Sequence, residues 1–190
     1  MDQQMTIEEF IDKYHSVLTE DQFSKAWDLK LGLATETWHL SDEGVAELDK
    51  KLVLYRRLDI TAERNNNGIL FEKNGAIEDA IKVYEENIAM SYPATHAFER
   101  LMIIYRKLKK YNDEIRVIQR AIKVFSNENE SRFKKAFENP INKSVKNELQ
   151  IGLETCTNIM GTNGFYAYCP YPVIKWSERL SKAMKLKSNI

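Results

Sequence analysis

The chain has 190 residues, of which 43% are hydrophobic, and its formal net charge is zero. This composition excludes wholesale disorder, and the length suffices for one domain with a substantial core. Gly and Pro number only 7 and 4, which favours an all-helical fold, and no run approaches the ~18 apolar residues that span a bilayer.

The start of the chain and its cysteines bear on location. Residues 1–10 are acidic and polar, unlike a secretory signal, so we expect a cytoplasmic protein. Cys156 and Cys169 match no zinc-binding spacing. In the cytoplasm we expect two reduced thiols, with a disulfide as the alternative.

Charge is unevenly distributed along the chain. Residues 1–50 carry 12 acidic and 4 basic side chains, whereas the remaining residues carry 16 acidic and 24 basic ones. Two interpretations are open: the acidic end packs near the basic body, or two polar surfaces contact different partners.

The first 40 residues predict two capped helices. Thr6 and Glu9 have the spacing of a capping box, and Thr19 begins a second one. A helical stripe of apolar residues follows each cap. Gly32 is expected to end or loosen the second helix.

An internal repeat with a period of 34 follows, over residues 64–125. A helix at about 41–58 is expected before it, and a helix at about 60–73 opens its first copy. Apolar residues fall on apolar residues under this shift, which is typical of arrays of helix–turn–helix units. The superposed pairs are Ile69 with Ile103, Phe71 with Tyr105, Ile77 with Tyr111, Ile81 with Ile115, Tyr84 with Ile118 and Ile88 with Ile122.

Small residues, aromatic residues, a turn glycine and a proline recur in a set order. The first copy has Gly68, Phe71, Gly75, Ala80, Ile81, Tyr84 and Pro93, and the second has Phe98, Leu101, Tyr105, Tyr111, Ala121 and Ile122. Over residues 62–125 this order resembles the tetratricopeptide repeat (TPR) family. Three residues of the second copy depart from the family pattern, where Met102, Lys109 and Glu114 replace a small residue, glycine and alanine, and this predicts a looser second copy. In the first copy, Asn87 replaces alanine.

The resemblance implies an all-α fold of TPR-like antiparallel helical hairpins, an α-solenoid fragment with flanking capping helices. We therefore expect a single helical domain over residues 1–190. Its parts are N-terminal helices at 1–60, two repeats at 61–125 and C-terminal capping helices at 126–190.

The stretch after the repeats predicts further short helices. We expect a polar break at 126–129, a short helix ended by Pro140, a helix over about 145–159 and a turn at 161–164.

The aromatic segment at 165–171 and Trp176 have two interpretations. They cover the end of the array, or they anchor an interface. A last helix is expected to start near Pro172 and to end in the basic residues 182–187.

The sequence contains no recognisable catalytic constellation. His15, His39 and His96 are far apart in sequence, and none belongs to an HExxH pair. No phosphate-binding glycine loop is present. We therefore expect a protein that is not an enzyme and uses no cofactor or metal; the alternative is a small enzyme whose site assembles from residues distant in sequence.

The resemblance places a binding groove on the first helix of each repeat. Asn and Arg there can grip a peptide backbone or a carboxylate through charge-assisted hydrogen bonds. Ile69 stands where the family's carboxylate clamp uses asparagine, so a chaperone-tail ligand is not expected. Coverage of the groove by the terminal helices is the alternative. The candidate partner-binding residues are Asn65, Asn66, Ile69, Glu72, His96, Arg100, Ile103 and Arg106.

A second candidate surface is basic. Residues 100–123 include 8 basic and 2 acidic side chains, and Arg116, Arg120 and Lys123 share one helix face. Such a stripe suits phosphate contacts, but it equally suits a solvated outer face.

The sequence therefore predicts a non-enzymatic module that binds a protein or peptide partner, as an adaptor, regulator or inhibitor. The alternative is a nucleic-acid-associated regulator that uses the basic face at 100–123. No membrane contact is expected, and the sequence indicates neither the partner nor the oligomeric state.

Overall fold

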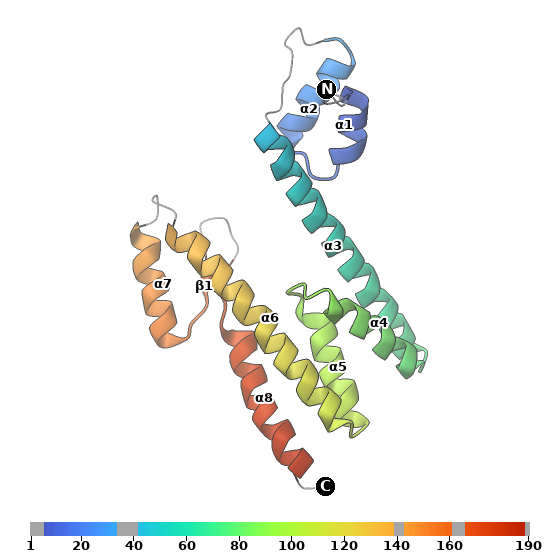
Figure 1. Ribbon diagram of the computed structural model, residues 1–190, viewed down its shortest axis with the longest axis vertical. Helices are drawn as coiled ribbons and strands as arrows, with labels where there is room; N and C mark the ends of the chain where they lie inside the picture. The colour runs from blue at the N-terminus through green and yellow to red at the C-terminus, as the bar shows by residue number, and fades with distance from the viewer. Residues whose placement is uncertain (1–5, 34–41, 139–142, 161–165, 189–190) are drawn as a thin grey trace. The chain divides into compact units, whose positions relative to one another are not determined.

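The computed structural model describes residues 6–33, 42–138, 143–160 and 166–188 (Figure 1). These residues form eight helices and one pair of short strands, which confirms the prediction of an all-α fold. The chain divides into two compact units, residues 1–62 and 63–190.

The first unit begins with two capped helices, α1 (Ile7–Tyr14) and α2 (Glu20–Lys30). The Thr6 hydroxyl accepts from the Glu9 backbone N–H at 3.2 Å, and the Glu9 carboxylate accepts from the Thr6 N–H at 2.8 Å. Thr19 makes the same reciprocal arrangement at the start of α2. Both predicted capping boxes are therefore confirmed.

Helix α3 (Asp42–Lys73) is continuous, whereas the sequence predicted two helices that meet near residue 59. No Gly or Pro lies there, so nothing interrupts the backbone hydrogen bonds. Tyr14 donates to Asp49 at 2.9 Å, which ties α1 to the first part of α3. The buried apolar residues of the first unit are Phe10, Ile11, Tyr14, Ala26, Leu48 and Leu52.

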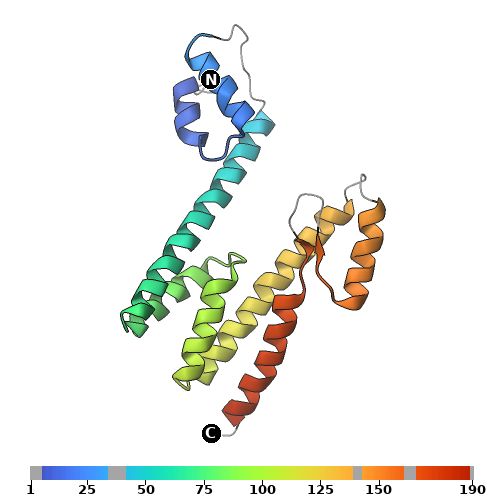
Figure 2. The same ribbon diagram turned by 180° about the vertical axis from the view of Figure 1, so that it is seen from behind.

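The second unit contains the last part of α3 and all later elements. In both views α8 lies beside α6, and α7 lies near the far end of α6 (Figures 1 and 2). β1 and β2 pair in antiparallel fashion. The elements are α4 (Ile77–Ala89), α5 (Thr95–Lys107), α6 (Tyr111–Glu138), α7 (Lys143–Thr155), β1 (Ile159–Met160), β2 (Tyr166–Tyr168) and α8 (Tyr171–Ser188).

The two turns of the 34-residue repeat have the same backbone structure. Gly75 has a φ of 75°, and Lys109, 34 residues later, has a φ of 58°. In both turns the residue that follows this position donates its backbone N–H, at 2.9 Å, to the carbonyl of the residue five positions before it. The left-handed residue itself donates at 3.1 Å to the carbonyl three residues before it. Both turns are Schellman motifs, and Lys109 holds a conformation that usually requires glycine.

The core of the second unit joins the repeat helices to α8. Trp176 is buried, and its ring packs edge-on against Phe125 with the centroids 4.9 Å apart and lies 6.4 Å from that of Phe98. This is the contact expected of a residue that covers the end of the repeats. A Cβ at Gly68 would lie 2.3 Å from the Tyr84 ring, so glycine permits the close approach of α4 to α3.

Helix α6 continues to Glu138, although the sequence predicted a break at 126–129. The polar residues there make contacts instead. The Asn129 side chain donates to the Cys169 carbonyl at 2.9 Å and accepts from the Cys169 N–H at 3.2 Å. Arg132 donates to Glu128, one turn earlier, at 2.6 Å.

The segment after α6 differs in part from the prediction. Helix α7 ends before residue 159, because Ile159 pairs with Tyr168 in the small sheet. The predicted turn at 161–164 and Pro140 lie outside the described residues. The predicted last helix is present and begins at Tyr171. Among the described helices, none is long and apolar enough to cross a membrane.

Candidate functional site

The residues predicted to bind a partner lie on α5 and on the last part of α3. Ile69 and Ile103 occupy equivalent positions in the two repeats, and both are only partly buried. Asn66, one turn before Ile69, is exposed. These three side chains are accessible to another molecule.

An ion pair between Glu72 and Arg100 joins α3 to α5. Arg100 Nε donates to Glu72 Oε1 at 2.9 Å, and its Nη2 donates to Oε2. This two-point geometry favours arginine over lysine. The bonds lower the pKa of the Glu72 carboxyl and raise the pKa of the Arg100 guanidinium. Tyr84 of α4 also donates to Glu72 at 2.9 Å, so three helices meet at this carboxylate.

His96 lies beside this ion pair. Its ring packs edge-on against Tyr84 with the centroids 5.8 Å apart. Its Nε2 is buried, and no described residue forms a hydrogen bond with it. Burial, and secondarily the charge of Arg100, lower the pKa of His96. The imidazole is therefore neutral at pH 7 and contributes packing rather than charge.

Asn65 and Arg106 also bond within the protein. Asn65 Oδ1 accepts from Asn87 Nδ2 at 2.8 Å, across α3 and α4. Arg106 Nε donates to Glu114 Oε2 at 2.6 Å, across α5 and α6. Both side chains therefore serve contacts between helices.

Glu114 is fully buried, which corrects the prediction of a loose second repeat. Its second carboxylate oxygen accepts from Arg179 Nε of α8 at 2.9 Å. Arg179 also donates to the Met102 carbonyl at 2.9 Å. Helix α8 thus closes the second hairpin at Met102 and Glu114, two of the three positions in the second copy that depart from the family pattern. The sequence held one sign of this contact, because Glu114 is a charged residue at a position where the family pattern has alanine. Nothing in the sequence indicated that its partner would be Arg179.

The structure thus separates the eight predicted residues into two groups. Five of them make contacts within the protein: Asn65, Glu72, His96, Arg100 and Arg106. The other three keep accessible surface: Asn66, Ile69 and Ile103.

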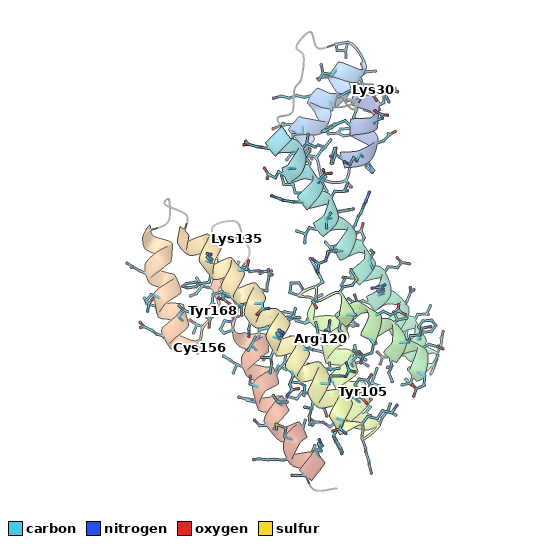
Figure 3. All side chains as sticks on the ribbon, viewed as in Figure 1. Lys30, Tyr105, Arg120, Lys135, Cys156 and Tyr168 are labelled. Carbon is cyan, nitrogen blue, oxygen red and sulfur yellow. The ribbon has the colours of Figure 1, made fainter. Side chains whose placement is uncertain are left out.

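The basic stripe on α6 contacts α4. Arg116 Nη2 donates to Glu85 Oε1 at 2.6 Å. Arg120 Nε donates to the Ile88 carbonyl at 3.0 Å, at the end of α4 where helix carbonyls need partners; Figure 3 labels Arg120. Lys123 is exposed. Two of the three charges expected on a solvated face therefore hold α6 to α4.

Within the described part of the chain, no cluster of three or more His, Cys, Asp or Glu side chains could hold a metal ion. Of the three histidines in the sequence, His39 lies outside that part. Comparison of the chain with family models, with curated proteins and with solved structures finds no match.

Proposed function

We propose that this chain is a non-enzymatic protein-binding module built on TPR-like repeats. It holds a protein or peptide partner against the α3–α5 face, as an adaptor, regulator or inhibitor. The observation that supports the proposal is the matched pair of turns at Gly75 and Lys109, which share φ region and hydrogen bonding. Arrays of such repeats use an extended surface formed by equivalent helices to bind partners.

The accessible residues have the composition of a contact surface. Ile69 and Ile103 contribute partly exposed apolar surface, and Asn66, one helical turn before Ile69, contributes an exposed polar group. Interfaces commonly combine a small apolar core with a polar rim. The Glu72–Arg100 pair fixes α3 against α5, so a partner does not have to order the surface on binding.

Site-specific photo-crosslinking tests the proposal. A benzoylphenylalanine is placed at Asn66, and in a control variant at Gln119, which is exposed on α6. In lysate of the native host, we expect Asn66 to crosslink to a discrete protein and Gln119 to give no such product. Ile103→Asp should abolish the Asn66 product without loss of helicity, because binding energy concentrates in a few central side chains.

Two outcomes would contradict the proposal. The first is the same crosslinked products from both positions. The second is tight binding of duplex DNA or RNA that weakens steeply with added salt and is lost in Lys123→Glu, as expected of phosphate contacts.

A further inference from the structure

A cavity of about 380 Å³ lies among α6, α7, β2 and the start of α8, apart from the α3–α5 face. This volume is within the range of ligand pockets, roughly 300–1,000 Å³. Helix α6 contributes Ser126, Glu130 and Phe133, and α7 contributes Leu153 and Cys156. All of these residues belong to the second unit.

The opposite wall is formed by β2 and the start of α8. Tyr168, Val173 and Ile174 line it, and Figure 3 shows Tyr168 and Cys156 near each other at this end of the unit. The two hydrogen bonds between the Asn129 side chain and the Cys169 backbone fasten this wall to α6. Hydrogen bonds to α6 therefore hold in place the segment between β2 and α8, which forms this wall of the cavity.

Apolar side chains dominate the lining. Phe133 and Val173 are partly buried, and Leu153 and Ile174 are 38% and 39% exposed. Exposed apolar side chains beside a concave site are typical of a ligand-binding surface. Burial of a ligand here would remove this surface from water.

The polar groups of the lining select the charge of a ligand. None of the described lining residues is Lys, Arg or His, and Glu130 contributes a carboxylate. An anion would meet no cationic side chain in this lining and would be repelled by Glu130. Burial, and secondarily Cys156, raise the pKa of Tyr168, so its phenol stays protonated and can donate a hydrogen bond.

We propose that this cavity binds a small aromatic or branched aliphatic molecule that is uncharged or cationic. Contact with Phe133 and Val173 supplies affinity, and the Ser126 and Tyr168 hydroxyls orient the polar end of the ligand. This site goes beyond the proposed protein-binding function and does not depend on it.

The reactivity of Cys156 reports whether the cavity is occupied. Its thiol is free, exposed and part of the lining. In a Cys169→Ala chain Cys156 is the one remaining thiol, and its rate of reaction with an aromatic disulfide reagent is measured. Indole, tryptamine and indole-3-acetate serve as probes, because they share one ring and are neutral, cationic and anionic. We expect indole and tryptamine to slow the reaction saturably, at least about fivefold, and indole-3-acetate to need at least about tenfold higher concentration.

Two tryptophan variants localise the effect. Ser126→Trp, at an exposed lining position, should fill the cavity and abolish protection by all three probes. Ile151→Trp, on α7, is 57% exposed and outside the lining, so it should keep wild-type protection. If Ser126→Trp fails to fold, Ile174→Trp takes its place.

Any of three results would overturn the inference. They are no saturable protection by indole or tryptamine, equal or better protection by indole-3-acetate, and protection that persists in the cavity-filling variant. A cavity that accepts only the side chain of a partner protein would give the first of these results.

Discussion

Arg179 Nε donates to Glu114 Oε1 at 2.9 Å, although 65 residues separate the two in the chain. Glu114 has no exposed surface, and Arg106 binds its other oxygen. A carboxylate is stable in such a place only when it is paired. The position of α8 is therefore set by a buried charge as well as by apolar packing.

Glu114→Ala should leave Arg106 and Arg179 without their shared counter-charge. We expect the free energy of unfolding to fall by about 2–4 kcal/mol, toward the lower end of the range for broken buried pairs. The reason is that the two arginine side chains are 31% and 27% exposed. Urea denaturation measures the loss. Glu178→Ala, at an exposed position of α8, should change it by less than about 0.5 kcal/mol, and equal losses would contradict this account.

Lys109→Gly should stabilise the protein, because Lys109 has a φ of 58°. A side chain in this region costs about 1–2 kcal/mol relative to glycine, and the greater freedom of glycine in the unfolded chain offsets part of the gain. We expect a net increase of about 0.5–1 kcal/mol, measured by thermal and urea denaturation. The matched change Lys107→Gly, at the last residue of α5, should instead destabilise by up to about 1 kcal/mol.

Arg120→Ala should weaken the contact between α6 and α4. It removes hydrogen bonds of 3.0 Å to the Ile88 and Ala89 carbonyls, so we expect a loss of about 1–3 kcal/mol in unfolding free energy. Lys123→Ala removes a charge of the same sign from the same helix face and should have almost no effect. If both variants were as stable as the wild type, the stripe would be a solvated face after all.

His96 should make stability depend on pH above the range in which carboxylates titrate. Its pKa is lowered from 6.5 in the folded chain, so the unfolded state binds the proton more readily. Stability is then fully present above about pH 6.5 and falls as the pH drops toward the folded pKa. Urea denaturation between pH 7.5 and 5.5 should show this decline, and His96→Gln should flatten it. An unchanged slope in the variant would mean that another group is responsible.

The features predicted correctly from the sequence are those specified by residues close together in the chain or by a fixed spacing. Thr6 and Glu9 specify their cap within four residues, and the 34-residue period located Ile69 and Ile103 on equivalent helices. The polar residues at 126–129 were misread as a break, because the partner of Asn129 lies 40 residues away. Sequence spacing carries no information about such a contact.

The same limit applies to the candidate site. The repeat pattern predicted which side chains lie on the first helices, but it did not predict that Arg100 would pair with Glu72, since that depends on the distance between two helices. Arg179 was missed altogether. Arg179 belongs to α8, which lies outside the 34-residue repeat, so the repeat pattern could not indicate its contact with Glu114.

The packing of Trp176 on Phe98 and Phe125 has a consequence for synthesis on the ribosome. Trp176 follows Phe125 by about fifty residues, which a ribosome adds in roughly 3–10 seconds at about 5–20 residues per second. Until then, both phenylalanine rings lack their cover in the emerging chain. The nascent protein therefore passes through an interval in which its repeat helices exist but their apolar end remains open to aggregation or to capture by a chaperone.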